Sequence, residues 1–268
     1  MMHLDGETRL IPILGDPIAQ VKSPALLSEG LAARGLNAIV PPVHARPADF
    51  AAVVTGLKRV GNVDGLVITV PHKFTASEVC DRLSDAARFI GSVNVIRREA
   101  DGTWFGDNCD GQGYVAGILE RGGVVKGASV LLVGAGGAGS AIAYQFLREG
   151  AARIAIHDAD IARRDGLIAK LNKGFAGRAG HGGDDPRGYD IIANATPMGM
   201  REGDPLPVRA DALEPEQFVA DCVTLPEITP LQDRARSLGC KTMTGIGMFD
   251  GVAERMVQFF ADPVMAEA

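Results

Sequence analysis

A glycine-rich turn between a predicted strand and a predicted helix carries the clearest chemical signal in the sequence. The apolar run Ser129–Val133 is typical of a buried strand, and six residues with the pattern G-x-G-x-x-G follow it directly. They are Gly134, Ala135, Gly136, Gly137, Ala138 and Gly139. Such a turn binds the pyrophosphate of a dinucleotide, because free N–H groups and the dipole at the start of a helix favour an anion. Gly134 would allow the tight turn, Gly136 the approach of the pyrophosphate, and Gly139 close packing of helix on strand. We expect the four glycines and Ala138 to bind the cofactor.

An acidic residue follows the next predicted strand, over residues 153–157. This residue is Asp158. Its distance in sequence from the glycine-rich turn is near the spacing of about 20 residues at which a carboxylate binds the ribose 2′-hydroxyl of NAD. A carboxylate there repels the 2′-phosphate of NADP, so the sequence favours NAD. Arg163 and Arg164 follow in the next predicted helix and could accept that phosphate, which keeps NADP open.

A lysine and an aspartate ahead of this turn could handle a proton. Oxidation of a secondary alcohol needs a group that takes the hydroxyl proton while the hydride leaves. A free lysine, with a pKa near 10.4, is protonated at neutral pH. Burial lowers a lysine pKa and a nearby carboxylate raises it, so the residues alone leave the balance between Lys73 and Asp110 open.

Seven segments, in this order, resemble the shikimate dehydrogenase family over nearly the whole chain. They are residues 15–24, 69–73, 92–94, 106–113, 194–200, 229–231 and 245–248. The resemblance implies an NAD(P)-dependent oxidoreductase of aromatic amino acid biosynthesis. It would transfer a hydride reversibly between the nicotinamide and a cyclic hydroxy acid, such as shikimate or quinate.

The resemblance also assigns residue roles. The implied catalytic residues are Lys73 and Asp110. The implied substrate-binding residues are Ser23, Thr69 and Asn94. Further cofactor-binding residues are Asn194, Thr196, Met198 and Gly245. His72 adjoins Lys73, but neighbours on an extended segment point to opposite faces, so we interpret His72 as structural or cleft-lining.

Four positions depart from the family pattern on the substrate side. They are Val21, where a serine is typical, Val67 for asparagine, Thr224 near a tyrosine, and Val252 near a glutamine. Such changes remove hydrogen-bond partners, and unpaired buried polar groups are costly. We therefore expect weak binding of shikimate and a preference for quinate, an amino or deoxy analogue, or a ring acid with fewer hydroxyls. Two alternatives remain: a non-catalytic metabolite-binding or sensor protein on the same fold, and a two-domain dehydrogenase acting on a folate or an amino acid.

Alternating apolar strands and helical patterns must position these residues. This alternation predicts an α/β fold with two domains. An open α/β substrate-binding domain is expected over residues 1–112, joined by the C-terminal helix over 246–268, and a Rossmann dinucleotide-binding domain over 113–245. The resemblance implies an active site in the cleft between them. Strands are predicted at residues 9–14, 38–43, 66–70, 92–97, 103–106, 129–133, 153–157, 190–193 and 217–221. Residues 174–189 are predicted as loop, and Thr229 as the cap of a helix to Leu238.

The composition excludes several classes of partner. The 268 residues carry a net charge of −6 without a basic stripe, so nucleic acid is not expected. A run of about 18 apolar residues is lacking, so a membrane partner is not expected either. The N-terminus lacks the pattern of a signal peptide, which favours the cytoplasm. The four cysteines are scattered without a histidine cluster, so we expect no metal site. The expected partners are a small-molecule substrate and a nicotinamide cofactor, in a monomer or homodimer.

Overall fold

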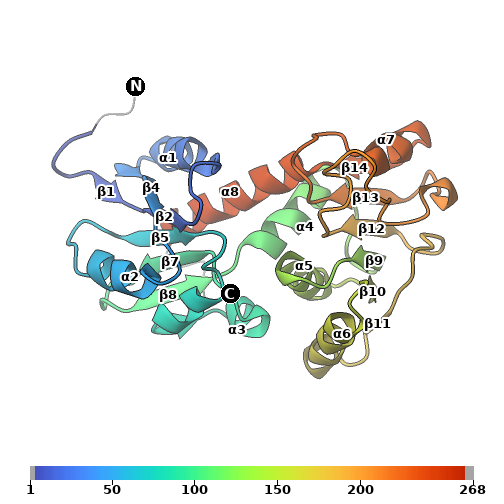
Figure 1. Ribbon diagram of the computed structural model, residues 1–268, viewed down its shortest axis with the longest axis horizontal. Coiled ribbons are helices and arrows are strands. Elements are labelled where there is room, and N and C mark those ends of the chain that lie inside the picture. Colours follow the sequence, from blue (N-terminus) through green and yellow to red (C-terminus); the bar gives the residue numbers. More distant parts are fainter. Residues whose placement is uncertain (1–3, 263–268) are drawn as a thin grey trace. The chain divides into compact units, whose positions relative to one another are not determined.

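Two six-stranded sheets, each in its own unit of the chain, organise the computed structural model (Figure 1). The structure describes residues 4–262. The first unit comprises Met1–Cys109 and Ala253–Ala268, and the second is Asp110–Val252. The predicted α/β class with two sheets is therefore confirmed.

The sheet of the first unit is mixed. Its strands lie in the order β4 (Pro42–His44), β2 (Ile13–Gly15), β5 (Gly65–Ile68), β7 (Val95–Arg98), β8 (Trp104–Asp107) and β6 (Arg82–Leu83). The helices of this unit are α1 (Ser23–Ala33), α2 (Phe50–Lys58), α3 (Asp85–Ile90) and the C-terminal part of α8 (Gly245–Ala261). β7 is antiparallel to both β5 and β8, and the other pairs are parallel.

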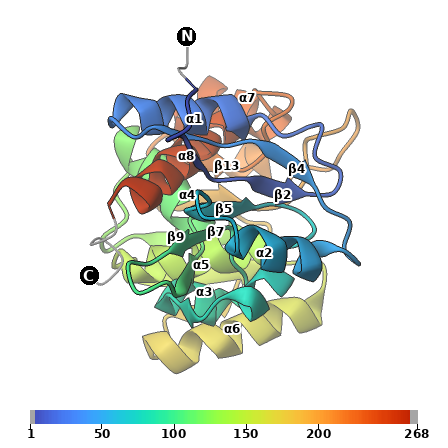
Figure 2. The ribbon, with the colours of Figure 1, turned by 90° about the vertical axis from the view of Figure 1, so that its left-hand side faces the viewer.

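Alternating residues of β5 pack the two faces of this sheet. Leu66 and Ile68 are fully buried in one apolar cluster with Phe50 of α2. Gly65 points to the opposite face, where a Cβ would lie 2.5 Å from Cε1 of Phe260 in α8. On that face α1 and α8 run next to each other (Figure 2). The sheet is therefore covered on both faces, which leaves its strand ends to carry polar groups.

Two predicted strands, over residues 9–14 and 38–43, are wrong in their extent. The first consists of β1 (Arg9–Leu10) and β2, and the second of β3 (Ala38–Ile39) and β4. β1 and β3 pair in a separate two-stranded sheet, whereas β2 and β4 pair in the six-stranded sheet. Pro12 lies between β1 and β2 and has no N–H to donate to a ladder, so the first strand does not continue through it.

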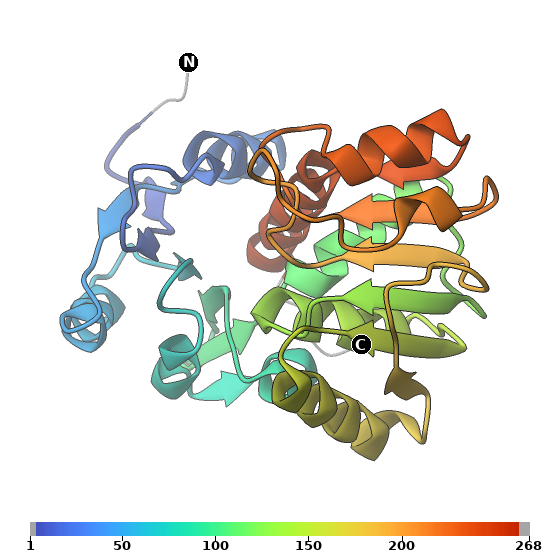
Figure 3. The same ribbon diagram turned by 45° about the vertical axis from the view of Figure 1, so that its right-hand side comes forward.

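The sheet of the second unit is entirely parallel (Figure 3). Its strands lie in the order β11 (Ala179–His181), β10 (Arg153–His157), β9 (Ser129–Val133), β12 (Ile191–Asn194), β13 (Phe218–Asp221) and β14 (Lys241–Met243). Its helices are α4 (Asp110–Glu120), α5 (Gly137–Arg148), α6 (Ile161–Phe175), α7 (Pro230–Ser237) and the start of α8. This is the doubly wound order 3-2-1-4-5-6 of a Rossmann fold, in which a dinucleotide binds where the order reverses, here between β9 and β12.

The prediction of residues 174–189 as loop is wrong, because β11 lies within it. β11 is a three-residue edge strand that pairs only with β10 among the described strands, so it needs no apolar run of its own. The predicted helix cap is confirmed: Thr229 precedes α7, and its side chain accepts a hydrogen bond from the N–H of Gln232.

Two further properties concern the described part of the chain, residues 4–262. No helix there is both long and apolar enough to cross a membrane. No group of three or more His, Cys, Asp or Glu side chains in these residues is placed to hold a metal ion.

Candidate active site

The glycine-rich turn has the geometry that each of its glycines predicts. Gly134 has a φ of +104°, a conformation that L side chains rarely adopt. A Cβ on Gly139 would clash with the carbonyl oxygen of Gly134, because the two atoms would be much closer than van der Waals contact allows. Gly136 is the N-cap of α5, and a Cβ there would meet no atom within 4 Å. The turn is therefore closed by two glycines, while the third leaves open space in front of the helix N-terminus, as a bound pyrophosphate requires.

Asp158 lies against this turn. Its Oδ2 accepts a hydrogen bond from the N–H of Ala135 at 2.7 Å, and its Oδ1 accepts one from the N–H of Asp160 at 2.8 Å. The side chain is only 11 % exposed. A carboxylate is therefore held at the carboxyl end of β10, beside the first residues of the turn.

The two arginines that could accept a 2′-phosphate already pair with carboxylates. Arg163 Nη1 lies 3.8 Å from Asp158 Oδ2, and its Nη2 lies 3.1 Å from Asp160 Oδ2. Arg164 Nε lies 2.8 Å from Asp165 Oδ1. A phosphate would therefore have to compete with these carboxylates for both guanidinium groups.

The loop over residues 194–200 adjoins the glycine-rich turn. A Cβ on Gly134 would lie 2.8 Å from the carbonyl oxygen of Ala195 and 2.8 Å from Cγ2 of Thr196. Asn194 Oδ1 accepts hydrogen bonds from the N–H of Thr196 at 3.0 Å and from its hydroxyl at 2.7 Å. That hydroxyl oxygen in turn accepts from the N–H of Met198 at 3.2 Å. The three loop residues predicted from the resemblance are thus joined in one chain of hydrogen bonds.

Asp221, at the end of β13, is a buried residue that the sequence analysis missed. It pairs with Asn194 across the β12–β13 ladder, and its Oδ1 accepts a hydrogen bond from Asn194 Nδ2 at 3.0 Å. Burial raises the pKa of this carboxyl. The signal available in the sequence was an aspartate at the end of a predicted strand, since carboxyl ends of neighbouring parallel strands meet at one edge of a sheet.

Gly245, the first residue of α8, belongs to the same edge. A Cβ on Gly245 would penetrate the carbonyl group of Val223, two residues beyond Asp221. The backbone at Gly245 therefore packs directly on the segment that leaves β13.

In the first unit, backbone hydrogen bonds join the segments that contain Lys73, Thr69 and Asn94. The carbonyl of Lys73 accepts from the N–H of Val93 at 2.8 Å, and the carbonyl of Asn94 accepts from the N–H of Ile68, next to Thr69, at 2.8 Å. Lys73 is half-buried and Asn94 is fully buried. Two predicted substrate-binding residues and the predicted catalytic lysine thus lie on segments that are fastened to one another.

The same asparagine holds the residue that precedes Asp110. Asn94 Oδ1 accepts a hydrogen bond from the N–H of Cys109 at 2.8 Å. Asp110 follows as the first residue of α4, where a carboxylate is favourable to the helix dipole.

His72 was interpreted from the sequence as structural or cleft-lining, and the structure shows that it is structural. It is 2 % exposed, its Nε2 lies 2.7 Å from the carbonyl oxygen of Ala45, and its ring stacks on Phe50 with centroids 4.4 Å apart. This anchoring keeps the segment of Lys73 in place.

The loop of Ser23 begins beside the Lys73 segment. The N–H of Asp16 donates to the carbonyl of Val70 at 3.0 Å, and Asp16 Oδ1 lies 2.7 Å from His44 Nε2. Ser23 lies at the other end of this loop, as the half-buried first residue of α1.

The four substrate-side departures differ in exposure. Val67 is 1 % exposed within β5, Val21 and Val252 are half-buried, and Thr224 is exposed. Val67 and Gly65 alternate with Leu66 and Ile68, so Val67 points to the face that α8 covers.

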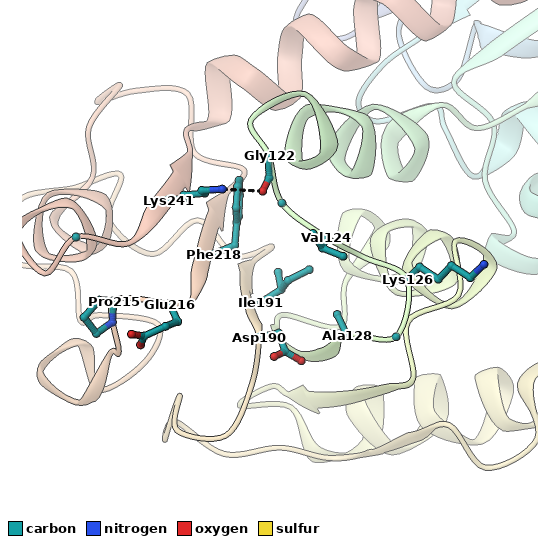
Figure 4. A pocket seen from close by; sticks show the side chains of 13 residues that line it. Gly122, Val124, Lys126, Ala128, Asp190, Ile191, Pro215, Glu216, Phe218 and Lys241 are labelled. Carbon is teal, nitrogen blue, oxygen red and sulfur yellow. Dashed lines mark hydrogen bonds between the residues drawn. The ribbon is translucent and has the colours of Figure 1, made fainter.

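A pocket of about 490 Å³ opens at the amino ends of β12, β13 and β14 (Figure 4). Two of its polar side chains bond to the protein itself: Lys241 Nζ donates to the carbonyl of Gly122 at 3.1 Å, and Asp190 Oδ2 accepts from the hydroxyl of Ser129 at 2.8 Å. The glycine-rich turn follows the carboxyl end of β9, so this pocket lies at the opposite edge of the sheet and is not the dinucleotide site.

Comparisons with known proteins identify the family. Residues 13–96 match the shikimate dehydrogenase substrate binding domain. The chain is 35 % identical over 269 aligned positions to the shikimate dehydrogenase (NADP(+)) of Rubrobacter xylanophilus, covering 97 % of this chain and 94 % of that protein.

Solved structures share the fold of the whole chain. The shikimate 5-dehydrogenase of Listeria monocytogenes, in complex with shikimate and NAD, superposes with a TM-score of 0.90 at 29 % identity, covering 97 % of this chain and 94 % of that one. The 5-ketofructose reductase of a Gluconobacter strain gives a TM-score of 0.87 at 29 % identity, covering 94 % and 92 %. With a relative above 30 % identity over nearly its full length, this chain belongs to the shikimate dehydrogenase family and is an NAD(P)-dependent oxidoreductase acting on a CH–OH group.

Proposed function

We propose that the first unit binds a cyclic hydroxy acid, that the second binds the dinucleotide, and that Lys73 and Asp110 handle the hydroxyl proton. The observation that carries this proposal is the role of Asn94, whose backbone bonds to the strand before Thr69 and whose side chain bonds to Cys109, next to Asp110. One buried asparagine thus fastens the segments that bear the proposed substrate and proton-transfer groups.

The protein residues orient the substrate and move its proton. Thr69 and Asn94 would hold ring hydroxyls by hydrogen bonds, and Ser23 would bind at the carboxylate. The amine of Lys73 takes the proton of the reacting hydroxyl, and the Asp110 carboxylate stabilises the ammonium group that forms. In the reverse direction the same ammonium group returns the proton to the carbonyl oxygen. The bound nicotinamide supplies the hydride acceptor or donor, and the protein supplies orientation and charge.

The substrate is proposed to be an analogue of shikimate rather than shikimate itself. Val21 and Val252 are half-buried apolar side chains where family members typically offer a hydrogen-bond partner, whereas Val67 is buried under α8 and presents no surface to a substrate. A hydroxyl that faces such a side chain loses its partner, which costs about 1–3 kcal/mol. This favours quinate, an amino or deoxy analogue, or a ring acid with fewer hydroxyls.

A substrate panel with both cofactors, followed at 340 nm, tests this proposal. We expect at least one analogue to have a kcat/KM about tenfold or more above that of shikimate, which corresponds to about 1.4 kcal/mol. Efficient turnover of shikimate above every analogue would overturn the altered specificity. Tight metabolite binding without turnover under either cofactor would instead favour a non-catalytic metabolite-binding protein.

The preferred cofactor is proposed to be NAD. The curated relatives from Rubrobacter and Geobacter are named for NADP(+), which favours NADP by similarity, whereas the Listeria structure contains NAD. The support comes from charge: Asp158 borders the turn, and Arg163 is shared between two carboxylates. A 2′-phosphate would meet the Asp158 carboxylate, which a 2′-hydroxyl can bind.

The variant Asp158→Asn is expected to lower the ratio of kcat/KM for NAD to that for NADP by about tenfold or more. Asparagine keeps the volume and an acceptor for the Ala135 N–H but loses the acceptor for the Asp160 N–H. Because both cofactors meet the same altered turn, the ratio reports the charge. Steady-state kinetics with both cofactors measure it. The matched control is Asp233→Asn, an exposed aspartate in α7 of the same unit, which should leave the ratio unchanged. An unchanged ratio in Asp158→Asn would count against a role for Asp158.

A further inference from the structure

A buried carboxylate at the end of β13 accepts three hydrogen bonds, two of them from other segments of the second unit. Asp221 is fully buried. Its Oδ1 accepts from Asn194 Nδ2 at 3.0 Å and from the N–H of Val223 at 3.0 Å, and its Oδ2 accepts from the hydroxyl of Thr229 at 2.8 Å. An ionised carboxylate offers only acceptors, so it can satisfy all three donors at once.

One route leads from this carboxylate into the loop over residues 194–200. Asn194 donates to Asp221 with its amide nitrogen, which leaves its amide oxygen to accept both the N–H and the hydroxyl of Thr196. The Thr196 hydroxyl then accepts from the N–H of Met198. Asp221 thus sets the orientation of the Asn194 amide, and the amide sets the first half of the loop.

A second route reaches the other half of the loop. Thr229, bonded to Asp221, also caps α7. Its side chain lies against Gly199, where a Cβ would be 3.3 Å from Thr229 Cβ, and Gly199 has a φ of +91°. The loop is therefore positioned from both sides by groups that converge on one carboxylate.

The position of the loop over residues 194–200 indicates which part of the dinucleotide it contacts. It follows β12, directly beside Gly134 of the glycine-rich turn, at the point where the strand order reverses. In a doubly wound sheet the dinucleotide crosses this point, with its adenosine half over β9 and β10 and its other half over β12 and β13. The loop over residues 194–200 thus lies under the nicotinamide half.

We propose that Asp221 is a positioning residue for hydride transfer: through Asn194 and Thr229 it holds the loop over residues 194–200 in the conformation that binds the nicotinamide ring. The inference rests on the proposed dinucleotide binding by the second unit. Burial raises the pKa of Asp221, and the hydrogen bonds from Val223, Thr229 and Asn194 oppose this rise in part.

Binding of NADH and of ADP-ribose, measured by calorimetry on the full chain, separates positioning from general stability. ADP-ribose lacks the nicotinamide ring, so it reports only the half of the site over β9 and β10. Asp221→Ala is expected to weaken NADH binding about tenfold or more while changing the ADP-ribose affinity by less than about twofold.

A conservative variant and a matched control complete this experiment. Asp221→Asn should keep the NADH affinity within about threefold, because the Thr229 hydroxyl can reverse and accept from the new amide. Asp190→Asn changes another aspartate of the same unit, at the opposite edge of the sheet, and should alter neither affinity. If Asp221→Ala does not fold, Thr229→Val, which removes one of the two routes, should weaken NADH binding about threefold with ADP-ribose binding retained.

Three results would contradict the inference. Equal losses for NADH and ADP-ribose would show a merely structural role, and unchanged NADH binding in Asp221→Ala would show no role. A wild-type chain that binds NADH no better than ADP-ribose would instead overturn the proposed nicotinamide site itself, so the two failures are distinguishable.

Discussion

Replacing Lys73 by methionine is expected to lower kcat by about 10²–10⁴-fold while leaving the affinity for NADH within about twofold. Methionine keeps most of the length and the apolar stem of lysine but cannot carry a proton. The backbone carbonyl of Lys73, which accepts from Val93, is untouched by the change, and His72 still anchors the segment through Ala45. Steady-state kinetics at 340 nm and calorimetry with NADH measure the two quantities.

The matched control for this loss is Lys173→Met, at an exposed lysine near the end of α6. It removes the same charge from the chain and should leave kcat unchanged. Near-normal kcat in Lys73→Met would remove Lys73 from the proton-transfer step. A parallel loss of NADH binding would show instead that the substitution had damaged the fold.

The variant Gly139→Ala should destabilise the protein by about 3 kcal/mol, the upper part of the range for overpacking. Its Cβ would collide with the carbonyl oxygen of Gly134, a backbone atom that cannot rotate away as a side chain can. Relief requires that α5 move away from the turn, which also displaces the N–H groups meant for the pyrophosphate. Thermal unfolding should show a Tm lower by about 6–12 °C, together with weaker NADH binding.

Alanine variants of two other glycines distinguish the effect of backbone packing on stability from the effect of filling the cofactor site. Gly136→Ala should keep the wild-type Tm, because its Cβ meets no atom within 4 Å, but should weaken NADH binding about tenfold by filling the space of the pyrophosphate. Gly166→Ala, in the interior of α6 with no neighbouring atom within 4 Å, should stabilise the chain by about 0.5–1 kcal/mol. A wild-type Tm in Gly139→Ala would contradict the close packing of helix on strand.

Several parts of the fold could be predicted because their determinants are local. The strand before Gly134, the turn and the start of α5 follow from a short apolar run and three glycines. Thr229 was predicted as a cap because its hydroxyl bonds only three residues ahead, to Gln232. The alternation argument for His72 did not apply, because residues 70–74 form turns, and its buried contact with Ala45 settled that it is structural.

Other parts could not, because their partners are distant in the chain. β11 is a strand only because β10, more than twenty residues earlier, offers it a ladder. Pro12 divides a run that looks continuous, since the two pieces pair with different sheets.

By itself, the sequence determined the α/β class and the glycine-rich turn between β9 and α5, since residue type and spacing encode helix and strand period, turns and caps, and it supplied candidates for binding a dinucleotide and moving a proton. Only the tertiary structure decided which groups meet. The place of Asp221 at the end of a predicted strand does not name its partners, yet the parallel register of β12 and β13 sets it against Asn194, and the following loop returns Thr229 to it. Hydrogen bonds between such segments depend on strand order, which short-range patterns do not encode.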